Sequence, residues 1–251
     1  MTDSLFISDL HLSQKCPGTT DLFLRFLEEQ VDAGVHLYIL GDLFDTWVGD
    51  DDTTPAIKKA THALLQATIR GAQLSIMHGN RDFLIGEAFA KTTGCTLLDD
   101  PTVVDLNGLP TLLMHGDLLC SDDLEYQQAR ELLRSHAFIS DFLAKPIQQR
   151  KILATEYRKK SGEVVSLKSA DIMDVNQYTV ETYMRNSGVK LLIHGHTHRP
   201  AIHDFKLDGQ SAERIVLSDW HEKRGEYLRV SGTEITRHMV SGASVLKKIY
   251  K

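Results

Sequence analysis

Apolar positions in three long stretches of the chain repeat with the spacing of an amphipathic helix. The stretches are TTDLFLRFLEEQVDAG at residues 19–34, TTPAIKKATHALLQATIRG at residues 53–71 and SADIMDVNQYTVETYMRNSG at residues 169–188. Each ends in a glycine, a residue that commonly stops a helix, and the second has Pro55 near its start. Ser169 is a candidate N-cap of the third helix. We therefore predict a helix in each stretch.

Shorter apolar runs lie before, between and after these helices, and in five of them the apolar residues are followed within two positions by Asp or His. They are LFISDLH (residues 5–11), LYILGDLFD (37–45), LSIMHGNRDF (74–83), TLLMHGDLL (111–119) and KLLIHGHTHRP (190–200). Two further strand-like runs, RIVLSDW and GEYLRVSG, follow close together. Strands that alternate with helices predict an α/β fold with helices on both faces, built on one mixed sheet or on two packed sheets.

Residues 121–168 break this alternation, because the segment contains no convincing strand. Two helix-like stretches, residues 122–144 and 146–161, are rich in aliphatic and aromatic side chains such as Phe138 and Phe142. The simplest interpretation is a helical hairpin inserted in the α/β domain. The hairpin is either a purely structural cap or a lid with an apolar interior over the ends of the strands.

The composition is that of one domain without covalent cross-links. With 251 residues, 42% of them hydrophobic, the chain can bury a substantial core, and we expect a single domain over residues 1–251. The three cysteines form no CxxC pair, which fits a reducing cytosol. No apolar run approaches the ~20 residues of a membrane-spanning helix, and the acidic start MTDSLFISDL is unlike a signal peptide. We expect a cytoplasmic protein and a monomer.

The charge is unevenly distributed along the chain. A net charge of −6 argues against a general nucleic-acid binder. Residues 145–168 nevertheless carry seven basic side chains against the acids Glu156 and Glu163. This segment is either a solvated helix face or a surface for phosphates or anionic lipid.

Seven side chains at the ends of the strand-like runs are candidates for a metal centre. Ligand sites on open α/β folds lie outside the carboxyl ends of the strands, so these side chains should converge. The alternating histidines of HGHTHRP could also form a half-buried strand face without a ligand. A mixed N/O set without thiolate suits a pair of divalent ions such as manganese, with iron or zinc as alternatives. The candidates are Asp9, His11, Asp42, Asn80, His115, His196 and His198.

The ordered motifs DLH, GDLFD, HGNRD, HGD and GHTH resemble the calcineurin-like metallophosphoesterase superfamily over nearly the whole chain. The resemblance implies two packed mixed β-sheets flanked by helices. It also implies that Asp9, His11 and His198 hold one ion and that Asp42, which follows a glycine, bridges both. The second ion would be held by Asn80, His115 and His196. His78 and His194 are expected behind the ligands or in strand packing.

The chain departs from the broad superfamily in the motif HGNRD. Many members have GNHD, whose histidine is taken as a general acid or phosphate binder, and here Arg81 stands in its place. Arginine is a poor proton donor at neutral pH because its pKa exceeds about 12. We therefore expect a substrate with a good leaving group, such as one phosphate of a diphosphate, with Arg81 clamping phosphoryl oxygens.

The extended motifs GDLFDTWVGDDD, HGNRDFLIG, HGDLLCSDDLEYQ and LIHGHTHRP resemble the UDP-2,3-diacylglucosamine diphosphatase family of lipid A biosynthesis. That family implies two Mn²⁺ ions, with Asp42, Arg81 and His196 as catalytic residues, and release of UMP and a lipid phosphate by water attack at the α-phosphorus. It also implies a helical lid over a two-chain lipid and a peripheral position on the cytoplasmic face of the inner membrane. Substrate-binding residues by motif position are Asn80, Arg81, Asp123, Ser161, Val165, Lys168 and His196.

The contribution of Val165 and the activity of the protein both have alternatives. Val165 stands where a polar residue is expected, so its contribution would be limited to backbone or contact area. A nuclease or cyclic-nucleotide phosphodiesterase of the same superfamily is the nearest rival, although the GNRD motif and the apolar insertion favour the diphosphatase. A scaffold that has lost catalysis is a third possibility, but such proteins usually show gaps in the ligand set, and here all seven positions are filled.

Overall fold

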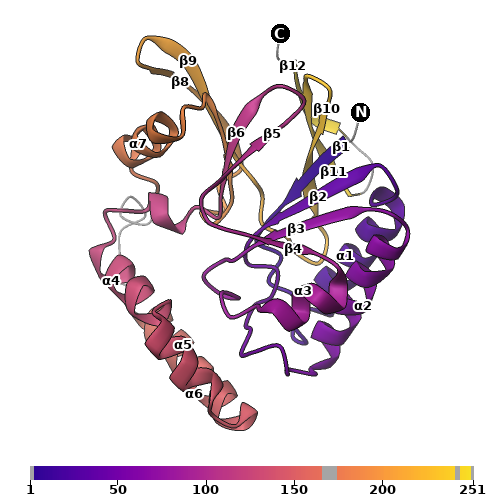
Figure 1. Ribbon diagram of the computed structural model, residues 1–251, viewed down its shortest axis with the longest axis vertical. Helices are drawn as coiled ribbons and strands as arrows, with labels where there is room; N and C mark the ends of the chain where they lie inside the picture. The colour runs from indigo at the N-terminus through magenta and orange to yellow at the C-terminus, as the bar shows by residue number, and fades with distance from the viewer. Residues whose placement is uncertain (1–2, 166–173, 241–243, 250–251) are drawn as a thin grey trace.

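The computed structural model describes residues 3–165, 174–240 and 244–249, and two mixed β-sheets form its centre (Figure 1). The first sheet has the strand order β12-β11-β10-β1-β2-β3-β4, in which β1 to β4 run parallel and β10 pairs antiparallel with β1. Its strands are β1 (Asp3–Ile7), β2 (Val35–Leu40), β3 (Gln73–Met77), β4 (Thr96–Leu98), β10 (Glu226–Ser231), β11 (Glu234–Met239) and β12 (Ser244–Ile249).

The second sheet has the order β5-β6-β7-β9-β8. Strands β6, β7 and β9 run parallel, and the antiparallel strands β5 and β8 form its edges. Its strands are β5 (Thr102–Asp105), β6 (Pro110–Met114), β7 (Leu191–His194), β8 (Ala201–Leu207) and β9 (Gln210–Val216). The predicted α/β architecture with two packed mixed sheets is confirmed.

Helices cover the outer faces of both sheets, so that the domain has four layers (Figure 1). The helices α1 (Pro17–Gln30), α2 (Pro55–Ile69) and α3 (Glu87–Thr93) pack on the first sheet through side chains such as Phe23 and Leu64. The helix α7 (Gln177–Ser187) packs on the second sheet through Val180 and Met184. Between the sheets lies a separate apolar core that includes Phe6, Leu40, Met77, Leu113, Ile193 and Ile215.

The third predicted helix begins later than the sequence pattern suggested. Asn176, and not Ser169, is the N-cap of α7, and its side chain accepts a hydrogen bond from the backbone N–H of Thr179 at 3.1 Å. Ser169 lies outside the described residues. The predicted stop at Gly188 is confirmed, since this glycine has a φ of 66° and closes the helix in the left-handed conformation.

The insertion is a helical hairpin, as predicted, and it projects from one end of the domain (Figure 1). Its first arm is not the continuous helix expected over residues 122–144. It consists of α4 (Leu124–Leu133) and α5 (His136–Leu143), because the side chain of Ser135 caps a new helix by accepting from the N–H of Phe138. After a short 3₁₀ turn (Asp117–Leu119) and these two helices, α6 (Ile147–Val165) forms the second arm.

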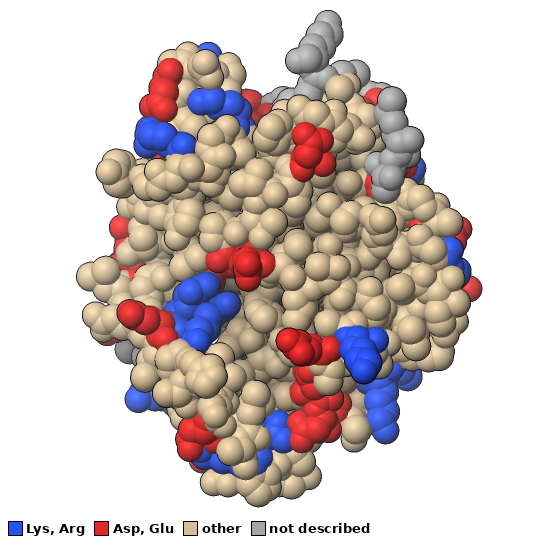
Figure 2. All heavy atoms as spheres, viewed as in Figure 1, with Lys and Arg blue, Asp and Glu red and all other residues tan. Residues whose placement is uncertain are grey.

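Basic side chains of α6 hold the hairpin against the loop that follows β2. Arg158 makes two hydrogen bonds to the carboxylate of Asp45, at 2.5 and 2.6 Å, and Arg150 forms an ion pair with Asp51. Lys151 lies 2.8 Å from Asp52. The basic run therefore pairs largely with acids of its own chain, and acidic and basic side chains lie interspersed where the hairpin meets the domain (Figure 2). Within this run Arg158 is partly buried by its contact with Asp45, whereas Lys159 and Lys160 are exposed.

Among the described residues, no helix is long and apolar enough to cross a membrane.

Candidate metal centre

Loops at the carboxyl ends of β1, β2, β3, β6 and β7 carry the seven candidate ligands, as the strand pattern predicted. Backbone hydrogen bonds join these loops, from Asp9 N–H to Gly41 carbonyl at 3.1 Å and from His11 N–H to Asp42 carbonyl at 3.0 Å. Gly195 N–H likewise donates to the carbonyl of His115 at 2.8 Å. These bonds join the loop after β1 to the loop after β2 and the loop after β6 to the loop after β7, in a layer at the carboxyl ends of the strands.

The backbone of this layer is strained at the candidate ligands. Of the seven non-glycine residues with positive φ in the described chain, five are candidates, with φ between 50° and 68°. Left-handed conformations of such residues cost free energy and persist where the surroundings impose them, which is common at functional sites. The five residues are Asp9, His11, Asp42, His196 and His198.

Glycines next to the candidates allow the loops to approach each other closely. A Cβ atom on Gly79 would lie 2.1 Å from Asp42 Oδ1, and one on Gly195 would lie 2.4 Å from Asp9 Oδ2. At Gly41, which also has a φ of 87°, a Cβ atom would lie 2.4 Å from the His115 ring. The glycine before Asp42 thus permits the close approach of this backbone to the His115 ring.

One group of candidates consists of Asp9, His11 and His198, whose ligand atoms lie within 4.8 Å of one another. His198 Nε2 is 3.4 Å from Asp9 Oδ1 and 3.3 Å from His11 Nε2. Asp9 is fully buried and its other oxygen accepts from the backbone N–H of His196 at 2.9 Å. This group corresponds to the predicted ligands of the first ion.

The second group lies beside the first and is linked to it by carboxylates. Asp9, Asp42 and His115 also place ligand atoms within 4.8 Å of one another. The side-chain oxygen of Asn80 lies 3.0 Å from His115 Nε2 and 3.1 Å from His196 Nδ1. All seven candidates are therefore brought together.

Asp42 lies between the two groups. Its Oδ2 is 3.9 Å from His11 Nδ1 and its Oδ1 is 3.9 Å from His115 Nε2, so one oxygen faces each group. Asp42 is buried, and its Oδ1 also accepts from the backbone N–H of Arg81 at 2.8 Å. This position is compatible with a bridging carboxylate, although Asp9 also takes part in both groups.

Burial and crowding of carboxylates shift the pKa values of the ionisable side chains in the centre. Burial, with the nearby charges of Asp82 and Asp9, raises the pKa of Asp42 to about 7, against the opposing effect of His115. Burial alone would lower the pKa of His115, but Asp42, Asp117 and Asp9 raise it to about 9. Burial lowers the pKa of His11 and of His196 to about 4. A buried site with this surplus of carboxylates is suited to cations.

Buried polar atoms without a hydrogen-bond partner also indicate that the site is suited to a cation. Asp9 Oδ1 and His11 Nδ1 are buried, and neither makes a hydrogen bond within the described part of the chain. A buried polar atom without a partner costs free energy, which a bound ion would offset. His115 Nδ1 lies 2.9 Å from the Leu40 carbonyl, so its Nε2 is the nitrogen available toward Asn80 and Asp42. The residues present therefore fit a divalent metal site.

The structure describes the side chains of only some of the predicted substrate-binding residues outside this cluster. The guanidinium of Arg81 makes no hydrogen bond or ion pair with any residue that the structure describes, while its backbone anchors Asp42. Asp123 is the N-cap of α4 and accepts from Tyr126 N–H at 3.0 Å. Ser161 and Val165 lie in α6, but their side chains, like all of Lys168, are outside the described residues.

Several positioning residues escaped the sequence analysis. Asp82 is fully buried and accepts hydrogen bonds from the N–H groups of Asp42, Phe44 and Gly79, which holds two of the loops together. Asp219 approaches His198 Nδ1 at 3.6 Å from the far side of the ring. Both follow an apolar run, Asp82 in HGNRD and Asp219 in RIVLSDW, so the strand-end pattern could have found them.

The hairpin also reaches the centre through α4. The buried carboxylate of Asp117 accepts from the Tyr126 hydroxyl and from Arg130 Nε, both at 2.7 Å. Arg134 lies 3.5 Å from Asp117 and donates to the Gly79 carbonyl at 2.9 Å. Since Gly79 precedes Asn80, the position of α4 is tied to the loop that carries a candidate ligand.

The fold and this centre define a class of protein. The sequence profile described as calcineurin-like phosphoesterase matches residues 4–200, and the chain belongs to that family. Among its relatives, a protein of Nitrosococcus oceani is 49% identical over 86% of this chain and 87% of its own length. Proteins of Marinobacter nauticus (47%, covering 87% and 90%) and Chromohalobacter salexigens (48%, covering 90% and 92%) are similar to the same degree. All three are named UDP-2,3-diacylglucosamine hydrolase, so the chain also belongs to this narrower family, and the resemblance seen in the motifs is confirmed.

Proposed function

We propose that this protein hydrolyses the diphosphate of UDP-2,3-diacylglucosamine, a step of lipid A biosynthesis. Water attacks the α-phosphorus, the bond from that phosphorus to the bridging oxygen breaks, and the products are UMP and 2,3-diacylglucosamine 1-phosphate. The observation that carries the proposal is the convergence of seven N/O side chains in a chain about half identical to hydrolases of that name. Beside them lies Arg81, whose guanidinium has no partner among the described residues.

In this proposal the centre would hold two divalent ions, and Mn²⁺ is the ion proposed because a mixed N/O donor set suits it. Asp9, His11 and His198 would hold one ion, and Asn80, His115 and His196 would hold the other, with Asp42 as a ligand common to both. When bound, such a pair of ions makes water a better nucleophile at neutral pH and neutralises charge on the phosphoryl oxygens.

The residues of the chain position the diphosphate. Asn80 and His196 lie 3.1 Å apart at the edge of the centre, and the half-buried Arg81 follows directly in the chain. Its forked donors can hold two phosphoryl oxygens at once, and they stabilise the charge that develops as the bond breaks. Arg81 donates no proton, so the lipid phosphate leaves as an anion.

The helical hairpin forms a lid for the lipid in this proposal. Phe138 and Phe142 stack on each other with ring centroids 5.8 Å apart, and Tyr157 of α6 faces Phe138 at 6.1 Å. Phe142 is buried in the core, whereas the partly buried Phe138 and the exposed Tyr157 lie on the arms of the hairpin, where they can contact acyl chains. Asp123, Ser161, Val165 and Lys168 are proposed to line the sugar and nucleotide side of the same space.

Peripheral binding to the cytoplasmic face of the inner membrane belongs to the same proposal. The hairpin exposes Leu124, Leu132 and Ile152, each more than half accessible, together with Lys159 and Lys160. Apolar and basic side chains on one element suit an anionic bilayer surface. Binding to vesicles that contain phosphatidylglycerol should weaken with added salt, and Lys159→Glu with Lys160→Glu should abolish it if these lysines contact the headgroups.

Product analysis in water enriched in oxygen-18 tests the reaction directly. Mass spectrometry should find the label in UMP and none in the lipid phosphate, because water adds to the α-phosphorus. Label in the lipid phosphate would mean attack at the β-phosphorus. Rapid turnover of a chromogenic phosphodiester without any turnover of the UDP-lipid would instead assign the protein to another branch of the phosphoesterases.

A further inference from the structure

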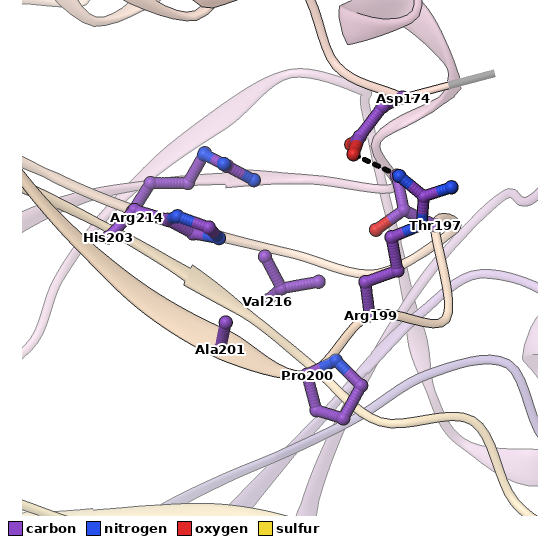
Figure 3. A pocket seen from close by; sticks show the side chains of 8 residues that line it. All are labelled: Asp174, Thr197, Arg199, Pro200, Ala201, His203, Arg214 and Val216. Atoms are coloured by element: carbon purple, nitrogen blue, oxygen red, sulfur yellow. Dashed lines mark hydrogen bonds and ion pairs between the residues drawn. The ribbon is translucent and has the colours of Figure 1, made fainter. Parts of the chain in front are cut away.

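Apart from the metal centre, the protein has a cavity behind the loop that carries His196 and His198 (Figure 3). The histidines contact Asn80 and Asp9 in the metal centre, whereas the intervening Thr197 and the following Arg199 line this cavity. Its volume is about 270 Å³. The other lining residues are Asp174, Pro200, Ala201, His203, Arg214 and Val216.

Arg214 is the unusual residue of this cavity. Only 6% of it is exposed, and its Nη1 lies 3.0 Å from Nε2 of His194. No carboxylate of the described residues lies within ion-pair distance of it, and its buried Nε has no hydrogen-bond partner. A buried cation without an ion-pair partner is costly, because burial removes hydration that an ion pair would replace.

The one carboxylate that lines the cavity, Asp174, gives Arg214 only part of a counter-charge, since it lies beyond ion-pair distance and attracts Arg214 at longer range. Asp174 is already in an ion pair with Arg199 and accepts the backbone N–H of Val175 at 2.7 Å. Burial and the charge of Arg214 lower the pKa of His203, which keeps this ring neutral at pH 7. Among the charged lining residues, two guanidinium groups therefore face one carboxylate.

The last polar group that lines the cavity is a hydroxyl without a hydrogen-bond partner among the described residues. The buried Oγ1 of Thr197 makes no hydrogen bond to any described residue. Figure 3 shows Arg214 and His203 on one side of the cavity and Asp174, Thr197 and Arg199 on the other, with the apolar side chains of Val216 and Ala201 between them. A small ligand in the gap can thus meet donors on both sides.

We propose that this cavity, which we call the Arg214 pocket, binds a small oxyanion, and specifically a phosphate group. A phosphate accepts several charge-assisted hydrogen bonds at once, matches the donors of arginine, and can accept from a threonine hydroxyl. The surplus positive charge disfavours a metal ion. The site is therefore chemically distinct from the acidic metal centre on the other side of the loop, and it does not depend on the reaction proposed above.

Two sources of phosphate are distinguishable by calorimetric titration of the full-length protein with its metal. One arm of the experiment uses inorganic phosphate and the other uses UMP. Binding of inorganic phosphate alone assigns the pocket to a free anion, and tighter binding of UMP assigns it to a nucleotide phosphate; either supports the proposal when it depends on the pocket residues.

Variants identify where the anion binds. Arg214→Gln should weaken binding at least about tenfold, since a factor of ten is about 1.4 kcal/mol and hydrogen bonds to charged groups contribute about that much or more. Thr197→Val should weaken it about threefold. Arg185→Gln is the matched control, because it removes the same charge from an exposed residue of α7 that pairs with Asp208. It should leave binding within about twofold, well under 1.4 kcal/mol.

Asn80→Ala tests binding at the metal centre. The pocket should keep its affinity in this variant. Melting curves verify folding of Arg214→Gln, and Thr197→Val provides the test if that variant unfolds. The proposal is overturned if neither phosphate nor UMP binds, if Arg214→Gln folds and binds like the parent, if Thr197→Val leaves binding unchanged, or if Asn80→Ala alone removes binding.

Discussion

Arg81 illustrates how one residue separates this chain from the wider phosphoesterase family. In the proposed reaction, the residue in this place would decide whether a proton donor or a permanent cation faces the phosphate. The backbone N–H of Arg81 binds Asp42, while its guanidinium remains unpaired among the described residues. The structure thus presents a cation whose hydrogen bonds are available to a ligand.

Arg81→Lys should lower kcat/KM for the UDP-lipid by about 10²-fold, since the ammonium keeps the charge but loses the bidentate geometry worth a few kcal/mol. Steady-state kinetics with the UDP-lipid measure the loss. Arg81→His is the informative partner variant. If it turned over faster than the parent, protonation of the leaving group would be limiting and Arg81 would not have the role proposed here.

Asp42 is expected to matter for the metals and little for packing. Asp42→Ala should reduce turnover by at least about 10³-fold, because removing a shared ligand abolishes several kcal/mol of charge stabilisation. Elemental analysis should find the metal content reduced. The metal-free variant should melt no lower than the metal-free parent, since burial already raises the pKa of this carboxyl and disfavours its charged form.

Asp42→Asn is a matched control that retains an oxygen able to accept from the Arg81 N–H. It should keep the loop geometry and still lose metal. Treatment of the parent with EDTA should abolish activity, and Mn²⁺ should restore it. Full activity after EDTA treatment, with no response to added manganese, would contradict a two-metal centre.

At the scale of elements, the hairpin is connected to the domain by polar contacts near the centre and by apolar contacts further out. Tyr126, Arg130 and Arg134 of α4 converge on Asp117, and Arg150 and Arg158 of α6 pair with acids after β2. Asp42 is the second residue of the loop after β2. Movement of either arm therefore breaks contacts to a loop that carries a candidate ligand.

Two phenylalanines of α5 separate a structural role of the hairpin from a lipid-binding one. Phe142 is 5% exposed and belongs to the core next to the first sheet, whereas Phe138 is only partly buried against it. Phe142→Ala should therefore lower stability by about 3–5 kcal/mol and affect all substrates alike. Phe138→Ala should cost less stability and should slow hydrolysis of a long-chain substrate more than that of a short-chain analogue.

For the long-chain substrate, each acyl methylene that loses its buried contact should cost about 0.8 kcal/mol of binding free energy. Kinetics with acyl chains of two lengths, together with melting curves, measure both effects. We would abandon the lid if both variants slowed short-chain and long-chain substrates by the same factor, in step with a lower melting temperature.

At the scale of the whole molecule, the four layers concentrate negative charge at one edge. Asp9, Asp42, Asp82 and Asp117 are all buried there, although they come from different loops. The metal-free protein partly compensates this charge by holding protons. Carboxylates raise the pKa of His115 from 6.5 to about 9.

This raised pKa predicts how stability depends on pH. Because folded His115 holds its proton to higher pH than in the unfolded chain, its contribution is fully present below pH 6.5 and is lost as the pH rises through about 9. The melting temperature of EDTA-treated protein should therefore fall between these values. Binding of Mn²⁺ should become tighter over the same range and release protons, since the ligands must be deprotonated.

Melting curves in EDTA and calorimetry in two buffers of different ionisation enthalpy measure these effects. Glu213, whose pKa burial and Asp204 raise to about 8, contributes in the same direction. His115→Gln is therefore the necessary control and should reduce the dependence on pH. A metal-free parent with a constant melting temperature between pH 6.5 and 9 would contradict the charge state assigned to His115.

The sequence determined the main elements and most of the centre. Runs such as LYIL and KLLI predicted strands because they are apolar over the length of a buried strand, and β2 and β7 occupy them. The residue following each run predicted the centre, since the carboxyl ends of parallel strands meet at one edge. Asp9, Asp42 and His115 converge for this reason.

Only the tertiary structure decided contacts between segments that are far apart in the chain. The ion pair between Arg158 and Asp45 joins residues 113 positions apart, so a basic run alone could not be assigned to solvent, lipid or an internal partner. Whether Arg214 has an ion-pair partner among the described residues likewise depends on the side chains around it, because strand periodicity gives the face of a strand residue but not its neighbours across the fold.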